Sequence, residues 1–430
     1  MIDNNENILS KDNSEDVLLR VENLSQYFKM GRQKLKAVDH VSFDIKKGEV
    51  FGLVGESGCG KTTTGRSIIK LYDITGGNVY FRDRRICAGT LDYKEAIKKA
   101  KNDCELQIDL LKDEYKNNPT SEELKDRINK LISVRDTIIA EQKTLMAEAI
   151  HDHKHGDSIY AAELVKQLDD EYLPELEALK DSNPELYKET LKKYRHERRV
   201  AKHSRFITRI QMIFQDPIAS LDPRMTVREI ISEGLVIKGI KDKEYIDNKV
   251  YEILETVGLV REHADRYPHE FSGGQRQRIG IARAVVMEPE MIIADEPVSA
   301  LDVSIQAQVI NLLNDLRKKL GLTILFIAHD LSVVKYFSDR IGVMYFGKLV
   351  ELASSDELFA HPLHPYTRSL LSAIPLPDPH YEKGRIRKTY NPIAEHDYSV
   401  SQPSLREVSP NHFVYCNDEE ELKYKKELGL

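Results

Sequence analysis

A glycine-rich stretch after a short apolar run has the residue types and spacing that bind phosphate groups. The apolar run is 50–54, and the stretch that follows it reads Gly55-Glu56-Ser57-Gly58-Cys59-Gly60-Lys61-Thr62-Thr63. Glycines let backbone N–H groups turn inward around phosphates, and a helix that starts directly afterwards adds its positive end. We expect Lys61 to reach the β- and γ-phosphates of a nucleotide, and the Thr62 hydroxyl to ligate Mg²⁺. A glycine turn without function is the alternative, which the length and context of the match disfavour.

Two adjacent carboxylates, Asp295 and Glu296, end a second apolar run at 291–294. Such a run is apolar enough to be buried on both faces of a parallel sheet, and open α/β sheets bind ligands at the carboxyl ends of their strands. Asp295 is then placed to hold a Mg²⁺ shell, and Glu296 to polarise an attacking water. An apolar run that ends in two acids is a weak signal alone, but a phosphate loop in the same chain strengthens it.

A third motif stands at the start of a basic helix. It reads Ser272-Gly273-Gly274-Gln275 and is followed by Arg276-Gln277-Arg278-Ile279. A serine hydroxyl and glycine N–H groups at a helix N-terminus make a second anion site. Here the sequence resembles the ABC ATPase family, whose signature is this Ser-Gly-Gly-Gln at a helix start. The resemblance implies that the motif binds the γ-phosphate of an ATP held by an opposite subunit, so that two ATP molecules join a dimer.

Four further positions resemble elements of the same family, in the family's order. Gln215 resembles the glutamine that touches Mg²⁺ and the water and abuts the membrane subunits. Asp302, at the end of Ser299-Ala300-Leu301-Asp302, resembles the loop through which two ATPases meet, and His329 resembles the switch histidine that contacts the γ-phosphate. Phe28 aligns with the aromatic residue that stacks on adenine, although Tyr27 is a competing choice and a core role for either ring stays open. The resemblance implies functional halves of both ATP sites.

Several stretches resemble the ATPases of oligopeptide and dipeptide importers within that family. They are 211–217, 220–225, 266–271, 295–304 and 364–371. The resemblance covers 17–83 and 207–377. It implies ATP and Mg²⁺ as cofactors, a related second ATPase, two membrane permeases, an extracytoplasmic peptide-binding protein, and a place at the cytoplasmic face of the membrane. The alternatives are an importer of nickel or antimicrobial peptides, or a soluble ABC ATPase that acts on chromosomes or ribosomes.

The fold we expect is an α/β ABC-type P-loop ATPase core with a helical subdomain that carries the signature, plus an inserted helical hairpin or bundle. We assign 1–16 to a disordered N-terminus, 17–87 and 206–375 to the core, 88–205 to the insertion, and 376–430 to a loosely packed C-terminal extension. Strands 291–294 and 323–328 should pair in parallel, because a helix at 305–320 separates them. The ABC family usually has a short link where the insertion lies, so the resemblance implies no role for it.

An apolar stripe indicates a long helix within the insertion. Its residues, Leu124, Leu131, Ile138 and Leu145, recur every seven positions after a turn at 117–119. Thr120 is predicted as the N-cap, with Glu123 completing a capping box. Neighbouring helices, bounded at 151–157 and 182–184, are expected to pack on the stripe. A hairpin that buries its own stripe is the simpler interpretation, and a docking or regulatory arm is the alternative.

Composition limits the remaining function classes. The 63 basic and 70 acidic side chains give a net charge of -7, which argues against a nucleic-acid partner. No run reaches the roughly 18–20 apolar residues of a membrane-spanning helix. Of the 4 cysteines only Cys416 follows residue 104, so we predict no iron–sulfur cluster, which needs about four thiolates. The histidines at 151, 153 and 155, expected in a loop, lack an evident fourth ligand, which disfavours a metal site.

Overall fold

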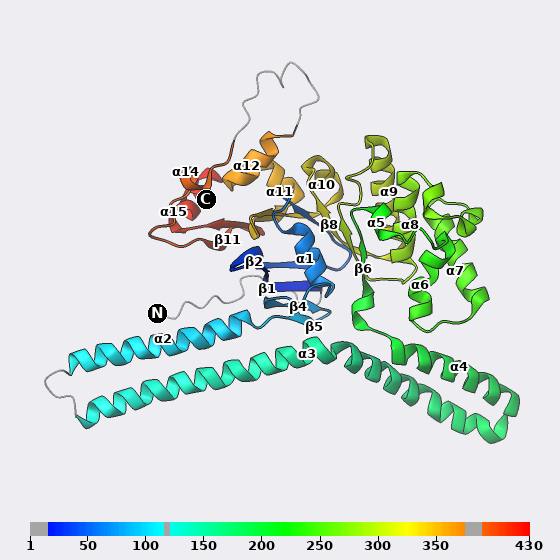
Figure 1. Cartoon of the computed structure of the whole chain (residues 1–430), viewed down its shortest axis with the longest axis horizontal. Coiled ribbons are helices and arrows are strands. Elements are labelled where there is room, and N and C mark those ends of the chain that lie inside the picture. The colour runs from blue at the N-terminus through cyan, green and yellow to red at the C-terminus, as the bar shows by residue number, and fades with distance from the viewer. Residues whose placement is uncertain (1–15, 116–120, 375–388) are drawn as a thin grey trace, which may run out of the picture.

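Two β-sheets that share a hydrophobic core form the centre of the molecule, and a long helical arm runs along one side of them (Figure 1). The computed structural model describes residues 16–115, 121–374 and 389–430. The smaller sheet is antiparallel, in the order β2-β1-β4-β5. Its strands are β1 (Val17–Met30), β2 (Gln33–Lys46), β4 (Gly76–Phe81) and β5 (Arg84–Ala88).

The larger sheet has eight strands in the order β11-β12-β10-β9-β3-β8-β7-β6. Its strands are β3 (Val50–Val54), β6 (Ile210–Ile213), β7 (Met291–Asp295), β8 (Thr323–Ala328), β9 (Arg340–Tyr345), β10 (Lys348–Ser354), β11 (Ser404–Ser409) and β12 (His412–Cys416). The strands from β6 to β9 are parallel, and the rest of the sheet is antiparallel. The predicted strands at 50–54, 291–294 and 323–328 are confirmed, as is the parallel pairing of the last two.

Strand β3 shows how the large sheet divides the interior. Val50 and Val54 belong to the core that this sheet shares with the helices, whereas Phe51 and Leu53 belong to the core between the two sheets. Successive side chains of a strand point to opposite faces, so a strand covered on both sides needs apolar residues throughout. The loop at the end of β3 is therefore anchored by a strand that is packed from both faces.

The helices of the core flank the large sheet. They are α1 (Lys61–Ile68), α5 (Pro217–Ser220), α6 (Val227–Ile237), α7 (Lys243–Thr256), α8 (Gly273–Val285), α9 (Val303–Leu320), α10 (Leu331–Phe337), α11 (Ser355–Ala360) and α12 (Pro365–Ser372), with 3₁₀ turns η1 (Phe206–Arg209), η2 (Arg261–Asp265) and η3 (Pro268–Glu270). Helix α8 packs on α5, α6, α7 and α9 and forms with them a helical group beside β6.

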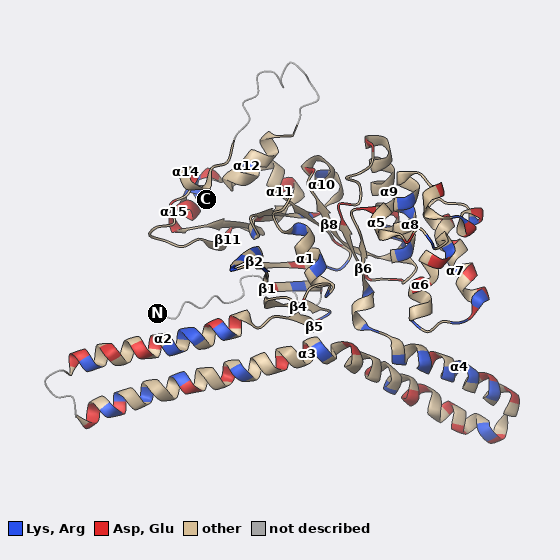
Figure 2. Cartoon of the chain, viewed as in Figure 1, with Lys and Arg blue, Asp and Glu red and all other residues tan. Residues whose placement is uncertain are grey.

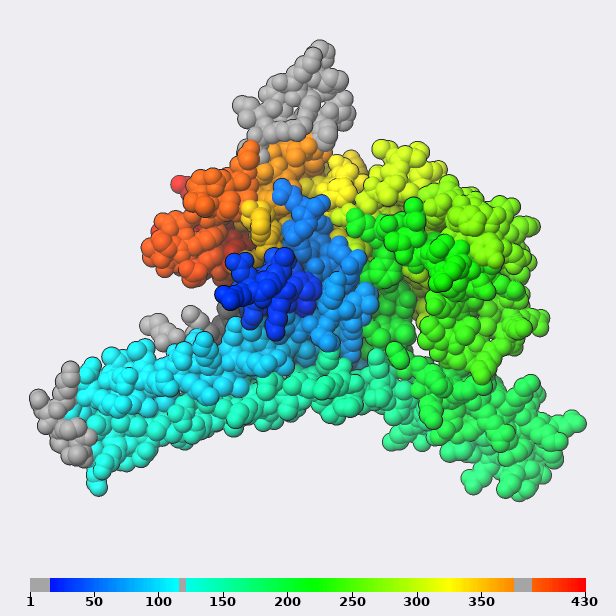
Figure 3. All heavy atoms as spheres, viewed as in Figure 1, coloured from blue at the N-terminus to red at the C-terminus, as the bar shows by residue number. Residues whose placement is uncertain are grey.

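The arm consists of α2 (Leu91–Glu114), α3 (Glu122–Ser182) and α4 (Pro184–His203). Helices α2 and α4 pack on opposite halves of α3, and the arm projects beyond the core at both ends (Figure 1; Figure 3). Acidic and basic residues are interspersed along all three helices (Figure 2). The predicted boundary at 182–184 is confirmed, because Asn183 caps α4 and Pro184 begins it. Within the described residues, no helix combines the length and apolar content that crossing a membrane requires.

Two expectations about the arm are wrong in detail. Helix α3 continues through 151–157, where a loop was expected, because core residues hold this stretch. Arg85 contacts Asp152 at 3.3 Å, and the Asp157 carboxylate accepts from the Ile207 N–H at 3.2 Å. The N-cap of α3 is Ser121, whose hydroxyl accepts from the Leu124 N–H at 3.1 Å. The predicted cap, residue 120, and the turn before it lie outside the described residues.

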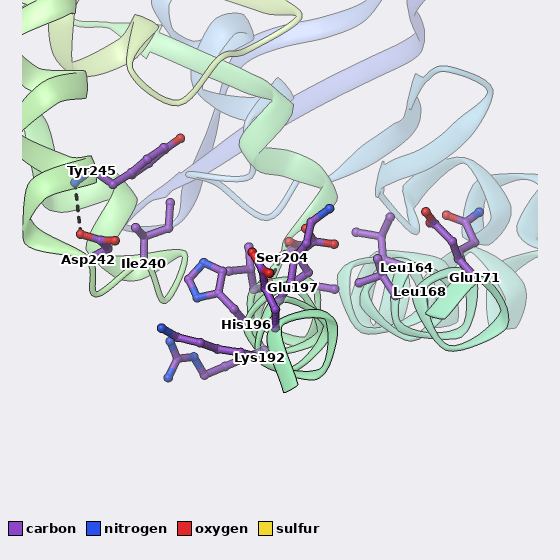
Figure 4. A pocket seen from close by; sticks show the side chains of 16 residues that line it. Leu164, Leu168, Glu171, Lys192, His196, Glu197, Ser204, Ile240, Asp242 and Tyr245 are labelled. Carbon is purple, nitrogen blue, oxygen red and sulfur yellow. Dashed lines mark hydrogen bonds and ion pairs between the residues drawn. The ribbon is translucent and has the colours of Figure 1, made fainter. Parts of the chain in front are cut away.

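A groove of about 1150 Å³ lies between the second half of the arm and the helical group (Figure 4). Leu164 and Leu168 of α3 and Ile240, just before α7, give it apolar walls, and Glu171 and Lys192 add charged groups. The arm therefore contacts the core closely at β5 and η1, and is separated from the helical group by this groove.

The residues after 389 belong largely to the large sheet, which corrects the expectation of a loosely packed extension. Strand β12 pairs with the edge of β10, and β11 pairs with β12. His412, Val414 and Cys416 are fully buried there. Two helices, α14 (Pro392–Glu395) and α15 (Asp418–Glu427), complete this part of the chain. The partner that buries these strands is β10, about 60 residues earlier in the chain, so the local sequence alone does not reveal their burial.

Candidate nucleotide site

The glycine-rich loop links β3 to α1 in a conformation that requires glycine. Gly60, at the N-cap position of α1, has φ of 108°, and a Cβ there would overlap the carbonyl oxygen of Ala37. The first turn of α1 contains no acidic residue, so its free N–H groups and positive end face the loop without a competing carboxylate. The loop thus has the form of a phosphate cradle.

Lys61 is buried at the start of α1 and is held by the loop itself. Its Nζ donates to the carbonyl oxygens of Gly55 at 2.7 Å and Glu56 at 2.9 Å. A charged group at 4% exposure needs such acceptors, because an unpaired buried ammonium is costly. The side chain is therefore inside the loop that a nucleotide would occupy.

Thr62 in the first turn of α1 contacts Asp295 at the end of β7, although 233 positions separate them in the chain. The Thr62 hydroxyl donates to Asp295 Oδ1 at 2.7 Å. The other carboxylate oxygen, Oδ2, is buried and has no hydrogen-bond partner among the described residues. Burial raises the pKa of Asp295 above its ordinary value, and the Thr62 hydrogen bond opposes that shift. A hydroxyl beside an unsatisfied carboxylate oxygen suits a hard, oxygen-seeking cation such as Mg²⁺.

Glu296 is aimed by an unusual backbone conformation at the end of β7. Its φ is 44°, in the left-handed region, and its N–H donates to the Ile327 carbonyl at 2.9 Å. Gln215 Nε2 donates to Glu296 Oε2 at 2.9 Å, and His329 Nδ1 lies 3.2 Å from the same oxygen. Non-glycine residues rarely adopt positive φ, and such strain gathers at functional sites. The structure thus brings together three of the predicted catalytic residues.

A small cavity borders this cluster. Its volume is about 40 Å³, and Glu296, Ser299 and His329 are among the residues that line it. This space is enough for a water molecule, and the lining offers polar partners for it. A carboxylate beside such a space is in the right place to act on a water.

The signature motif is built into the start of α8. The Ser272 hydroxyl accepts from the Gln275 N–H at 3.4 Å, and Gln275 Oε1 accepts from the Ser272 N–H at 3.0 Å, which is a reciprocal capping box. Gly273 faces Leu301 of the loop before α9, and a Cβ on Gly274 would lie 2.6 Å from Cγ2 of Ile305 in α9. The structure does not bring this motif to the phosphate loop of the same chain, because α8 and α1 lie well apart (Figure 1).

Asp302 lies beside the signature as the N-cap of α9. Its Oδ1 accepts from the Ser304 hydroxyl at 2.7 Å and from the Ile305 N–H at 3.0 Å. These hydrogen bonds, that of Ser304 first, hold the pKa of Asp302 below its ordinary value. The loop at 299–302 and the signature are therefore packed together within one chain.

Of the two aromatic candidates on β1, Phe28 is the less engaged. It is half-buried, with its ring centroid 5.4 Å from that of Tyr72 in an edge arrangement. The Tyr27 hydroxyl donates to Asp39 at 2.5 Å, and Lys36 Nζ lies over the Tyr27 ring at 5.2 Å. A ring whose face a cation already covers is a poorer platform for a base, so the geometry favours Phe28.

Sequence reasoning missed Tyr366 as a neighbour of the loop. Its hydroxyl accepts a hydrogen bond from the Glu56 N–H at 3.0 Å. The stretch 364–371 gave a family resemblance only, and no local pattern signals a contact between residues 310 positions apart.

The chain matches two models of known protein families and several curated relatives. The family model described as ABC transporter matches 38–173 and 179–299, and the model described as Oligopeptide/dipeptide transporter, C-terminal region, matches 350–399. The oligopeptide transport ATP-binding protein OppF of Bacillus subtilis is 46% identical, over 94% of this chain and 97% of its own length. The dipeptide transport ATP-binding protein DppF of Lactococcus lactis is 40% identical, over 96% of this chain and 98% of its own length.

Solved structures of ATP-binding cassettes are also similar. A dimeric cassette in a post-hydrolysis state with ADP and Pi matches with a TM-score of 0.47 and 21% identity, over 79% of this chain and 99% of that chain.

The chain therefore belongs to the ABC transporter family and has its mixed α/β ATPase fold. Within that family it is an ABC ATPase of the oligopeptide/dipeptide transport group, as the C-terminal match and the full-length relatives show.

Proposed function

We propose that this chain binds ATP with Mg²⁺ and hydrolyses it to power the uptake of oligopeptides or dipeptides through partner permeases. The observation that carries the proposal is the Glu296 carboxylate, which Gln215 and His329 hold beside a water-sized cavity at the end of β7. Its neighbour Asp295 meets Thr62 of the phosphate loop. Phosphoryl transfer to water depends on positioning and charge neutralisation, which are the tasks such groups perform.

The phosphate loop is the proposed seat of the nucleotide. Backbone N–H groups of residues 55–63 would cradle the phosphates, and Lys61 would exchange its two carbonyl acceptors for phosphate oxygens. Thr62, Asp295 and Gln215 would hold Mg²⁺, which neutralises charge on the phosphate oxygens when bound. The unsatisfied Oδ2 of Asp295 supports this assignment. Phe28 is proposed to stack on the adenine.

Hydrolysis is assigned to the cluster at the ends of β7 and β8. Glu296 is proposed to accept a hydrogen bond from the attacking water and so to orient that water toward the γ-phosphate. Gln215 fixes the direction of that carboxylate, and His329, which is half exposed, is proposed to contact the γ-phosphate.

A second chain would complete each site. The signature residues 272–275 lie far from the loop of their own chain, so they are proposed to face the γ-phosphate of an ATP on a related ATPase subunit. Asp302 and its loop would lie at that contact. We further propose two permease subunits, an extracytoplasmic peptide-binding protein, a position at the cytoplasmic face of the membrane, and no nucleic-acid partner.

The test is affinity capture of the chain from its native membrane in mild detergent, followed by ATPase assays with and without added peptides. We expect two permeases, a sister ATPase and a peptide-binding protein to co-purify, and peptides to stimulate hydrolysis. Glu296→Gln should reduce hydrolysis by about 100-fold or more while MgATP binding persists. Recovery of ribosomal or chromosomal proteins without a permease would contradict the transport role, and full activity of the variant would contradict the role of Glu296.

A further inference from the structure

Tyr366 links the C-terminal part of the chain to the phosphate loop. It lies near the start of α12, is 2% exposed, and its hydroxyl accepts from the Glu56 N–H at 3.0 Å. This hydrogen bond is part-buried and joins residues 310 positions apart in the chain. The phenol oxygen therefore fixes the orientation of the Gly55–Glu56 peptide.

The same peptide region holds Lys61. Its Nζ donates to the carbonyl oxygens of Gly55 and Glu56, and it also contacts Cys59 Sγ at 3.7 Å. A Cβ on Gly55 would lie 2.2 Å from the Met344 carbonyl oxygen, so the loop is closely enclosed at this residue. Anchoring the Glu56 N–H thus restrains the position of the two carbonyls that orient the lysine.

Tyr366 is itself fixed by a buried polar chain that starts in β12. The Tyr366 N–H donates to His364 Nδ1 at 3.1 Å, and the His364 N–H donates to Glu351 Oε2 at 3.0 Å. Glu351 Oε1 lies 2.9 Å from His412 Nε2, and both side chains are fully buried. Burial lowers the pKa of His364 to about 3, so its ring is neutral and Nδ1 remains an acceptor.

Aromatic packing holds the Tyr366 ring from its sides. Its centroid lies 4.4 Å from that of Tyr345 and 5.6 Å from that of Tyr390. Such contacts between rings stabilise their relative positions beyond the effect of burial. Because Tyr390 belongs to the segment after 389, both the polar chain and the ring contacts connect the C-terminal residues to the loop.

We propose that Tyr366 is a positioning residue of the ATP site, through which the C-terminal region orders the phosphate loop before nucleotide arrives. The inference rests on the ATP site proposed above. An ordered loop binds MgATP more tightly, because less conformational entropy remains to be lost on binding. Removing the hydroxyl alone should therefore weaken nucleotide binding without impairing the chemical step.

The experiment compares Tyr366→Phe with Tyr345→Phe in the full-length chain. Tyr345→Phe is the matched control, because it removes a hydroxyl from the same ring cluster without touching the Glu56 N–H. We expect Tyr366→Phe to raise the Kd for MgATP by about 3- to 10-fold. In the assembled transporter it should raise KM by a similar factor and leave kcat within about twofold. The control should match wild type.

Cys59 provides a second readout inside the loop. It is 6% exposed, and Cys87 and Cys416 are fully buried elsewhere. Tyr366→Phe should speed alkylation of Cys59 several-fold, measured by mass spectrometry, and leave the other two unchanged. Unchanged Kd and Cys59 reactivity would overturn the inference, as would equal acceleration at all three cysteines, which reports general loosening. Failure of the wild-type chain to bind MgATP would instead overturn the proposed function.

Discussion

The nucleotide core and the helical arm are held together in different ways. The core surrounds its chemistry with residues that solvent does not reach, such as Ile293 and Asp295 on β7. The arm has a 61-residue helix, α3, in which Ile138 and Leu145 of the apolar stripe are each 37% exposed. Burial on both faces of a sheet restricts the positions of its side chains. The arm has only two layers of helices, so its stability depends on local helix formation and on partly exposed contacts. Positions in the core should therefore tolerate little change, and positions in the arm much more.

The clearest contrast should appear between two isoleucines. Ile293→Ala removes a fully buried side chain between the two sheets and should lower the free energy of unfolding by about 2–5 kcal/mol. Ile138→Ala removes a partly exposed one and should cost about 1 kcal/mol or less. Urea unfolding followed by circular dichroism measures both. Equal losses would mean that the arm is as tightly integrated as the core.

Two glycines give the same contrast at the level of the backbone. Gly60→Ala places a Cβ against the Ala37 carbonyl at a φ of 108° and should weaken MgATP binding by about 10- to 100-fold. Gly156→Ala, in the middle of α3, places a Cβ 3.8 Å from the Arg85 carbonyl, which is ordinary contact. It should stabilise the chain by about 0.5–1 kcal/mol and leave ATP binding unchanged. Calorimetric titration and thermal unfolding would separate the two results.

The buried Asp295 carboxylate should lower the stability of the nucleotide-free chain, although the proposed Mg²⁺ site needs it. Burial raises its pKa, so the folded chain holds this proton more tightly than the unfolded chain, and that contribution to stability is lost as pH rises through the folded-state pKa. At neutral pH the ionised group is a net cost. Asp295→Asn should therefore stabilise the nucleotide-free chain by about 1–3 kcal/mol at pH 7, and by less near pH 4.

The same substitution should remove the benefit of Mg²⁺ for ATP binding, because the amide is a poorer ligand than a carboxylate. Melting temperatures at the two pH values, with and without MgATP, test both effects. A variant that is less stable than wild type at pH 7 would contradict the stated cost of the buried charge.

Sequence reasoning succeeded where a motif or an apolar run is local. The strands at 291–294 and 323–328 are short, continuous apolar runs, and the structure has both. Prediction from the sequence failed where contacts between distant residues determine the local conformation. The stretch 151–157 is rich in His and Asp with a Gly, a composition that favours loops, yet contacts to Arg85 and Ile207 keep it helical. The role of Tyr366 beside the loop could not be foreseen, since it depends on residues far apart in the chain.

The sequence predicts only part of the candidate site. The phosphate loop could be predicted because its glycine spacing is specific. The pairing of Gln215 and His329 on one oxygen of Glu296 needed the fold, since three separate elements supply these side chains.

The core should bind nucleotide without the arm, because the arm stands outside the nucleotide site. The most direct test replaces 88–205 by a short flexible linker and measures MgATP binding by calorimetry. We expect a Kd within about twofold of wild type, together with some loss of stability, because Tyr160 of α3 packs against Phe206 at 5.0 Å between ring centroids. A deletion variant that remains folded but has lost all affinity for MgATP would contradict this expectation.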